Sequence, residues 1–438
     1  MQGINVNREL INTTHVLDKK PIKSILKKPM SLSNQTDSLP LSTIQPPTQP
    51  PTQPPTQPTP TIQPLSTPQP TPTSQLDKTQ LDYFDIVVYI TSTSLNFNPM
   101  APFQTANFIN GRGSGFFIGP NIIMTASHVV NNALQDIGIK ITIPSIGKTE
   151  PYDARIVSLI PEIDIALITV TSPNFVPVKK YFKLGDDRRV IPGSLLEVYG
   201  YPMGEQMVKM TRSNYNGLQD GGIQIDSGIN PGNSGGPVLF NNEVIGVVSF
   251  GYDASIANNI SYAVPISSYL ALKPLSPEKI EPKPRIIRIP SLGIIYTNGT
   301  MTHSDRPMCE NSINVKWISS YSSLYGKIET GDKLCQIIVH DQPTTTYIIN
   351  NMGEVQVSWY KSKIPLEHAI AIIPYGTEID IVYWSSKEKQ TKTLRTILRP
   401  VKHGAFNPVY YPIESIDYEV FAGMVVMPLR ATHLVVYN

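Results

Sequence analysis

The chain has 438 residues, of which 40% are hydrophobic and 16% are charged, and its net charge is +2. This length predicts about three domains, and the composition is typical of a globular protein. So small a net charge argues against a dedicated nucleic-acid-binding protein or a surface that binds polyanions. The two cysteines, Cys309 and Cys335, make no disulfide framework and lack the neighbours of a zinc site, which fits a reducing compartment without requiring one.

The N-terminus lacks the apolar core of a secretory signal, and no run approaches the roughly 18 apolar residues of a membrane span. We therefore expect an intracellular protein without a membrane segment. The sequence does not identify the exact compartment, and a viral particle and a host cytoplasm are both among the alternatives.

Residues 1–80 show no sustained apolar periodicity, and residues 40–72 contain thirteen prolines, with Pro-Pro-Thr-Gln three times in succession at 46–57. A segment with few apolar side chains and few backbone donors cannot form a packed core. We expect a disordered arm with polyproline II character, which serves either as a spacer or as a docking strip for a proline-binding module.

Short β-branched and apolar runs separated by turn residues follow over 81–272. The expected strands are 84–90, 114–118, 137–143, 154–160, 164–170, 195–200, 237–240 and 244–250. Strands of this length and spacing predict an antiparallel sandwich or barrel, and the segment leaves room for two small barrels.

The run Gly-Ile-Asn-Pro-Gly-Asn-Ser-Gly-Gly-Pro-Val, residues 228–238, places Ser234 among glycines. A glycine-rich turn can fold tightly while its amide N–H groups converge on one point. Such a turn can present a serine beside donors for an oxyanion, although a plain turn between two strands has the same composition.

Two other residues offer the groups that such a serine needs. His128 lies in an apolar run at 122–130, where the rim of a core can hold its ring in one tautomer. Asp164 opens a strongly apolar strand, a costly place for a carboxylate unless it is paired. A serine needs a base to take its proton, and the base needs an acid to orient it. We therefore predict His128, Asp164 and Ser234 as a catalytic triad, with the Gly232 and Ser234 amides as the oxyanion hole.

The segments GSGFFIGPNIIMTASHVV, DIALITV and GINPGNSGGPVLFNNEVIGVVSF resemble the three catalytic blocks of trypsin-like serine proteases, and are most similar to the HtrA/Deg branch. The resemblance covers about residues 110–265. It implies a mainly β fold, a double β-barrel with the catalytic groups in the cleft between the barrels. His128, Asp164, Ser234 and Gly232 fall on the matching family positions.

Two positions depart from the digestive trypsins. Asn233 stands where those enzymes carry an aspartate that pairs with a newly cut N-terminus, a difference that HtrA proteases share. Gly228 stands where trypsins that cleave after Lys or Arg carry a pocket aspartate. An uncharged pocket cannot offset the desolvation of a buried cation, so we expect cleavage after small or medium aliphatic residues.

Residues 273–288 are charged and proline-bearing, which predicts a linker, and a mixed α/β domain is expected over 289–400. Within it we expect a helix at 364–373 and strands at 378–384 and 391–398. The segment Leu292-Gly293-Ile294, followed by a Gly-Asp-Lys-Leu run at 331–334, resembles a PDZ domain of HtrA/Deg type. The resemblance implies that these three residues form a peptide-carboxylate loop. The alternative is a domain that packs without binding peptide.

Residues 417–429 are similar to the region between two PDZ domains of plant and fungal Deg proteases, so 401–438 is expected to be a tail or the remnant of a second PDZ domain. The sequence thus predicts a serine endopeptidase that acts on unfolded or partner polypeptides without metal or organic cofactor. Trimers or multiples of them are implied by the resemblance alone. The alternative is a non-catalytic, chaperone-like or scaffolding protein that retains the fold.

Overall fold

The structure, a computed structural model, describes residues 83–438 except 105–106, 135–136, 145–147, 220, 229, 252–259, 276–280, 300–308, 342, 401–409, 431–432 and 434–438. The proline-rich arm expected at 1–80 lies outside the described residues. Of the tail expected at 401–438, only 410–430 and residue 433 are described.

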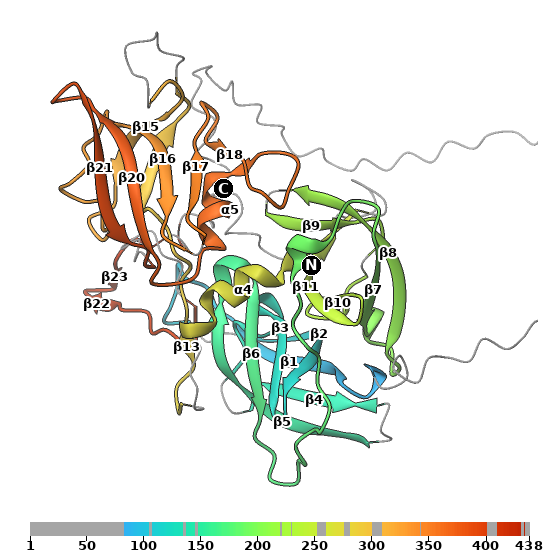
Figure 1. Ribbon diagram of the computed structural model, residues 1–438. Coiled ribbons are helices and arrows are strands. Elements are labelled where there is room, and N and C mark those ends of the chain that lie inside the picture. The colour runs from blue at the N-terminus through green and yellow to red at the C-terminus, as the bar shows by residue number, and fades with distance from the viewer. Residues whose placement is uncertain are drawn as a thin grey trace, which may run out of the picture. The chain divides into compact units, whose positions relative to one another are not determined.

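The first half of the β segment expected at 81–272 is a closed antiparallel barrel with one added strand. Its sheet order is β13-β5-β4-β1-β2-β3-β6, and pairing of β5 with β6 closes the ring of six. The strands of the ring are β1 (Val87–Asn96), β2 (Asn107–Gly119), β3 (Ile122–Ala126), β4 (Ile139–Ile143), β5 (Lys148–Ile160) and β6 (Ile165–Val170) (Figure 1).

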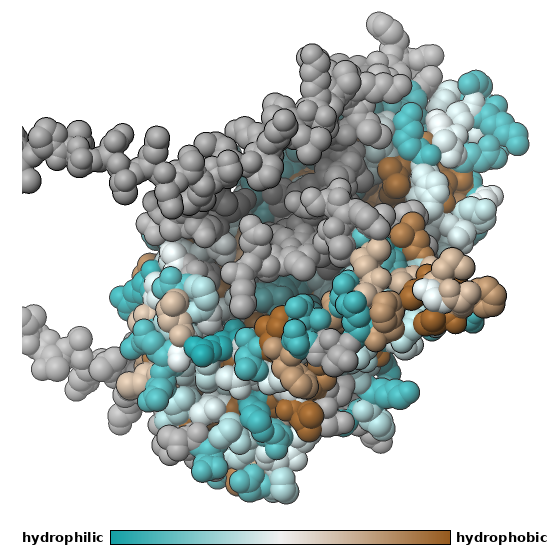
Figure 2. Space-filling model, turned by 180° about the vertical axis from the view of Figure 1, so that it is seen from behind, coloured by the Kyte–Doolittle hydropathy of each residue, from teal (hydrophilic) through white to brown (hydrophobic). Residues whose placement is uncertain are grey.

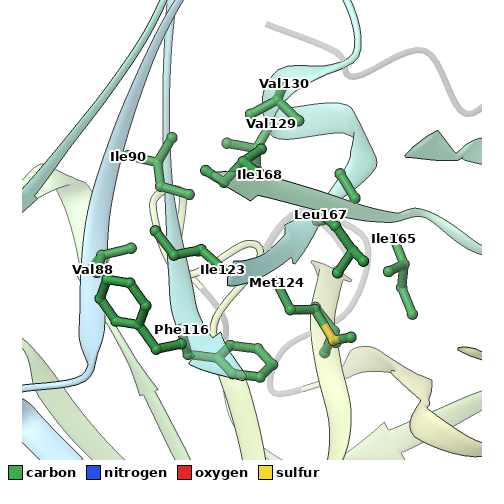
Figure 3. Close-up of a cluster of buried hydrophobic side chains, with 14 of the residues drawn as sticks. Val88, Ile90, Phe116, Ile123, Met124, Val129, Val130, Ile165, Leu167 and Ile168 are labelled. Atoms are coloured by element: carbon green, nitrogen blue, oxygen red, sulfur yellow. The ribbon is translucent and has the colours of Figure 1, made fainter. Parts of the chain in front are cut away.

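Continuous apolar runs explain why β3 and β6 are buried on both sides. All six residues of β6 are buried, and Ile123 and Met124 of β3 face the same core as Phe116 of β2. Figure 3 shows this cluster, which also includes Val129, directly after His128. The core therefore lies immediately behind two of the predicted catalytic positions.

The second half is another closed six-stranded barrel, with the order β10-β11-β12-β9-β8-β7. Its strands are β7 (Leu195–Gly200), β8 (Lys209–Gln219), β9 (Gly222–Ile225), β10 (Pro237–Phe240), β11 (Glu243–Gly251) and β12 (Ser261–Pro265), and the helix α4 (Ile266–Leu272) follows (Figure 1). The expected double β-barrel is confirmed.

The segment expected to be a linker contributes a strand to the first barrel's sheet. Strand β13 (Arg285–Ile286) runs parallel to β5, with Arg285 opposite Ser158. The next residue, Ile287, is 2% exposed and packs in the first barrel's core. The sequence did not predict this strand, because Ile286 and Ile287 stand among charged residues and prolines that are typical of a linker.

A further β region with its own core follows residue 290. Its sheet has the order β14-β15-β16-β20-β21, with β17 paired to β16. Its elements are β14 (Ile294–Thr297), β15 (Ile313–Ile318), β16 (Lys333–Val339), β17 (Thr345–Ile348), β18 (Glu354–Val355), β19 (Ile364–Pro365), α5 (Leu366–Ala371), β20 (Glu378–Ser385) and β21 (Gln390–Ile397). The helix and the two strands expected from the sequence are all present.

The two cysteines lie in this region and are bonded to each other. Cys309 and Cys335 have Cα atoms 5.1 Å apart, and both side chains are buried. The sequence did not predict this single bond, because two cysteines 26 residues apart carry no spacing signature.

The described part of the tail ends in a hairpin, β22 (Glu419–Phe421) and β23 (Met424–Val426). Phe421 and Met424 are exposed, and Figure 2 shows apolar side chains gathered where this hairpin lies. No helix among the described residues is long and apolar enough to cross a membrane.

Candidate active site

The turn that carries Asp164 has a backbone that few residues adopt. After β5, Pro161–Ile163 form a 3-10 turn, and Asp164 closes it in the left-handed region (φ 53°, ψ 42°). The Asp164 N–H donates to the Pro161 carbonyl over 3.1 Å. Aspartate tolerates this region better than most residues because its short polar side chain can bond locally. The turn fixes where the Asp164 carboxylate lies at the start of β6.

His128 lies beside this carboxylate because of strand register. Ala126, the last residue of β3, pairs with Ile165 of β6, and the short helix α3 (Ser127–Val130) follows at once. The His128 N–H donates to Asp164 Oδ1 over 2.9 Å, and His128 Nδ1 lies 2.8 Å from Oδ2. A carboxylate only accepts, so Nδ1 carries the proton and Nε2 keeps its lone pair in the neutral ring.

The two groups stabilise each other's charge. Burial acts to lower the pKa of His128, but the charge of Asp164 and its hydrogen bond outweigh this, and the pKa of His128 is raised. Burial likewise acts to raise the pKa of Asp164, and the charge of His128 with hydrogen bonds from His128 and Ser249 lowers it. Asp164 is therefore held as a carboxylate that favours a protonated His128 ring.

Ser249 is a site residue that sequence reasoning missed. Its hydroxyl donates to Asp164 Oδ2 over 2.6 Å, and its carbonyl accepts from the Ser234 hydroxyl over 3.2 Å. Ser249 follows five buried residues of β11, and a hydroxyl at that end of an apolar strand was the available signal. Ser249 links the acid to the serine through one residue.

The structure brings His128 and Asp164 into direct contact, and Ser234 joins them through Ser249. In the part of the chain that the structure describes, no hydrogen bond joins Ser234 Oγ to His128 Nε2. The Ser234 side chain is half-buried, and nearly half of the His128 side chain (46%) is exposed. Both side chains are thus partly accessible to solvent.

The turn before Ser234 has its carbonyl groups bonded away from the predicted oxyanion site. The Pro231 carbonyl accepts from Met203 N–H over 2.6 Å, and the Asn233 carbonyl accepts from Gly236 N–H over 2.9 Å. Within one planar trans peptide the N–H points opposite to the C=O. The N–H groups of Gly232 and Ser234 therefore point the other way, and neither has an acceptor among the described residues.

Two contacts hold this turn in place, and they need glycine at position 232. Gly232 has φ +103°, and its carbonyl accepts from the Ser114 hydroxyl over 2.6 Å. A Cβ at Gly232 would lie 2.3 Å from the Tyr201 carbonyl oxygen. The Ser234 carbonyl in turn accepts from Ser114 N–H over 2.8 Å. Ser114 of the first barrel thus anchors the turn of the second.

The other predicted site residues lie elsewhere. Gly228 is exposed, six residues before Ser234. Leu292 is buried in the core of the C-terminal β region, and Gly293 has φ +64°. The Gly293 N–H donates to the Ser291 hydroxyl over 3.0 Å, so this amide already has an acceptor.

No cluster of three or more His, Cys, Asp or Glu side chains suited to a metal ion occurs in the described ranges.

The fold and the site match known proteins. A family model described as a trypsin-like peptidase domain matches residues 113–247, which include His128, Asp164 and Ser234. The Arabidopsis thaliana protein named protease Do-like 2, chloroplastic, is 32% identical over 192 residues, or 41% of this chain and 30% of its own length. Do-like 13 from the same plant is 26% identical over 79% of this chain and 69% of its own length. The chain therefore spans between about a third and two thirds of these relatives.

A serine protease DegP homolog of Plasmodium falciparum is 31% identical over 35% of this chain and 18% of its own length. Among solved structures, the variant HtrA-type protease AlgWS227A with a decapeptide shares the fold with a TM-score of 0.53 and 17% identity, over 76% of this chain and 99% of that one. Residues 113–247 thus match the trypsin-like peptidase domain, and the chain is similar in sequence to the plant Deg proteases and in fold to an HtrA-type protease.

Proposed function

We propose that this protein is a serine endopeptidase that hydrolyses peptide bonds through His128, Asp164 and Ser234. The observation that carries the proposal is the chain of hydrogen bonds from His128 through Asp164 and Ser249 to Ser234. A base, an orienting acid and a nucleophile are the parts that acyl transfer by serine requires.

The proposed reaction begins with a rotation of the Ser234 side chain from the Ser249 carbonyl to His128 Nε2. His128 then takes the hydroxyl proton while Ser234 Oγ attacks the peptide carbonyl carbon. The Asp164 carboxylate holds the ring through Nδ1 and stabilises the positive charge that forms on it. The His128 cation next protonates the leaving amine, and water repeats the same steps on the acyl-enzyme.

The Gly232 and Ser234 N–H groups would bind the oxyanion of the tetrahedral intermediate. Their support is the orientation of the turn, in which both amides lack an internal acceptor among the described residues. Preorganised donors of this kind contribute on the order of 3–4 kcal/mol to transition-state stabilisation. The mechanism uses no metal ion or organic cofactor.

For specificity we propose a pocket without charge at Gly228, and hence cleavage after small or medium aliphatic residues. Sequencing the new C-termini of a digest tests this, and a predominance of Lys or Arg there would contradict it.

For the C-terminal region we propose a PDZ-like peptide-binding domain over 289–400. Strand β14 lies at the edge of its sheet and its Ile295 is exposed, as pairing with an incoming peptide strand requires. Binding of a peptide carboxylate by Leu292-Gly293-Ile294 would displace the Ser291 hydroxyl from Gly293 N–H. Polypeptide substrates and a homo-oligomer, a trimer or a multiple of it, complete the proposal.

One observation favours a second function. The Ser234 hydroxyl is bonded to the Ser249 carbonyl and not to His128, which also suits a chaperone-like or scaffolding protein that keeps the protease fold without catalysis.

The test uses a fluorophosphonate probe and digestion of an unfolded protein with the wild type and Ser234→Ala. We expect the wild type to label and cleave, and the variant to do neither while keeping its thermal midpoint. A folded wild type that neither labels nor cleaves would favour the non-catalytic function.

A further inference from the structure

The turn that positions Asp164 has a partner outside the two barrels. Glu162 lies in the 3-10 turn two residues before Asp164, and its Oε1 accepts from Arg288 Nη1 over 2.7 Å. Arg288 follows the linker strand β13. The side chains are only 14% and 22% exposed, so this ion pair is largely removed from water.

The linker strand delivers Arg288 to this place. Ile286 pairs with Leu159, and the Ile287 N–H donates to the Leu159 carbonyl over 2.7 Å. Leu159 stands two residues before Pro161, so strand β13 runs alongside β5 up to the point where the Asp164 turn begins. The position of Arg288 is thus set by backbone pairing as well as by its own side chain.

Arg288 is held from its other side by the C-terminal tail. Its guanidinium lies 5.3 Å from the centre of the Tyr410 ring, and its Nη2 lies 3.9 Å from Glu414 Oε2. The Glu414 carboxylate accepts from Tyr410 N–H over 3.1 Å, which fixes the tail around the cation. Arg288 therefore joins three segments, the Asp164 turn, the linker and the tail.

Removal of Arg288 would leave the Glu162 carboxylate largely buried without its cation. Its Oε2 already has no hydrogen-bond partner among the described residues. A carboxylate left in this state must move toward water or take up a proton. Either change acts on a turn of three residues that ends in the left-handed backbone of Asp164, which the surroundings must hold in place.

We propose that Arg288, through Glu162, is a positioning residue for the Asp164 carboxylate, and so couples the linker and the C-terminal tail to the active site. The inference rests on the proposed function, since it assigns Arg288 a part in that reaction. Arg288 touches neither His128 nor Ser234, so its effect passes through the Asp164 turn.

The test compares the full-length wild type with Arg288→Ala and Arg285→Ala well below their thermal midpoints. Arg285 is a matched control because it lies three residues before Arg288, on strand β13, and forms its own ion pair, 2.5 Å from Glu281, away from the Asp164 turn. We expect Arg288→Ala to lower the rate of fluorophosphonate labelling and kcat by roughly tenfold to a hundredfold at little-changed KM. Arg285→Ala should stay within about twofold of the wild type.

A double variant, Glu162→Gln with Arg288→Ala, should recover most of the labelling rate, because it leaves no buried charge. Should Arg288→Ala fail to fold, Arg288→Gln, which keeps a donor on a chain of similar length, is measured in its place.

A second readout needs no substrate. The proton between His128 Nδ1 and Asp164 should give a far-downfield proton resonance in the wild type and in Arg285→Ala, and a shifted or broadened one in Arg288→Ala. A folded Arg288→Ala with both the wild-type labelling rate and the wild-type resonance would overturn the inference alone. A wild type that shows the resonance but does not label would overturn the proposed function instead.

Discussion

At the scale of single residues, Ser249 contacts two of the three proposed catalytic residues. Its hydroxyl bonds Asp164 and its carbonyl accepts from Ser234, so one residue fixes the charged form of the acid and the resting rotamer of the nucleophile. A hydrogen bond to a charged group contributes about 1.5–3 kcal/mol. The hydroxyl and the carbonyl can be tested apart, because a side-chain substitution leaves the carbonyl in place.

We predict that Ser249→Ala slows acylation by about tenfold, because Asp164 loses one of the hydrogen bonds that stabilise its charge. The pKa of Asp164 should rise, because its charged form loses a hydrogen bond. The pKa of His128 should rise as well, because the carboxylate charge is no longer partly neutralised by the Ser249 hydroxyl. Since the reaction needs neutral His128, the acid limb of the kcat/KM profile should move to higher pH. Labelling kinetics across pH measure both effects. Ser267→Ala, on helix α4, serves as a control whose acid limb should stay in place, and an unmoved limb in Ser249→Ala would contradict the prediction.

Asp187 is a buried acid that the reaction does not use. Its two oxygens accept from Ser267 N–H over 2.7 Å and from the Ser267 hydroxyl over 2.9 Å, which holds the start of helix α4. Burial raises its pKa to about 6, and the hydrogen bonds from Ser267 only partly oppose this. The folded state therefore binds a proton that the unfolded state has already lost between about pH 4 and pH 6.

Protonation of Asp187 makes the folded protein more stable at low pH. A raised pKa in the folded state contributes stability that is present below about pH 4 and is lost as pH rises through about 6. We predict that the wild type loses on the order of 2–3 kcal/mol of unfolding free energy over this window from this group. Asp187→Asn, which mimics the protonated acid, should lack this loss. Thermal midpoints of both proteins measured from pH 4 to 8 decide the matter, and parallel curves would count against it.

At the scale of elements, the turn before Ser234 combines a positive φ with a close approach of two backbones. Gly232 has φ +103°, and a Cβ there would meet the Tyr201 carbonyl oxygen. Gly193 has a similar φ of +91° but nothing within 4 Å of its Cβ position. A substitution at Gly193 therefore tests backbone strain alone, whereas a substitution at Gly232 tests backbone strain together with a steric clash.

We predict that Gly193→Ala costs about 1 kcal/mol, the strain of a left-handed alanine, and leaves labelling unchanged. Gly232→Ala should cost several kcal/mol more and abolish labelling, because either the Tyr201 carbonyl or the Gly232 amide must move. Chemical denaturation gives the stabilities and the fluorophosphonate probe gives the rates. Equal costs for the two variants would show that the Tyr201 contact does not govern this turn.

The sequence predicted most of the strands that are rich in β-branched and apolar residues, but it missed the apolar β3 and β12 as well as the polar β8. Strands β1, β6 and β11 contain unbroken apolar runs, whereas β8 reads KMTRSNYNGLQ, with polar residues at most positions. Strand β8 is a strand because its neighbours β7 and β9 complete a closed barrel, which no local pattern reports. The family resemblance supplied the double barrel that these local signals left incomplete.

The sequence likewise predicted part of the candidate site. His128, Asp164 and Ser234 stand in motifs, and the structure joins them through hydrogen bonds. Ser249 lies in the last of the segments that resemble the protease family and Arg288 lies outside all of them, and the contacts of both depend on register between strands distant in sequence. The disulfide between Cys309 and Cys335 is of the same kind, since it depends on where the chain brings the two residues together.

At the scale of the whole molecule, the end of the trypsin-like domain lies further along the chain than its composition indicates. Strand β13 belongs to the first barrel's sheet, and Ile287 is buried in that barrel's core. A boundary placed before Arg285 cuts through the protease fold, whereas a boundary after Pro290 keeps the strand and Arg288 together.

We predict that a chain ending at Pro290 folds with a thermal midpoint well above that of a chain ending at Lys283. The shorter chain loses β13 and exposes the site of Ile287, whose burial alone contributes about 2 kcal/mol. The shorter chain should also label more slowly, because Glu162 loses Arg288. The chain ending at Pro290 keeps Arg288 but lacks Tyr410 and Glu414, so its labelling rate should lie between those of the full chain and the shorter one. Calorimetry and labelling on the three proteins provide the measurement, and equal midpoints for the two truncated chains would show that β13 is no part of the protease fold.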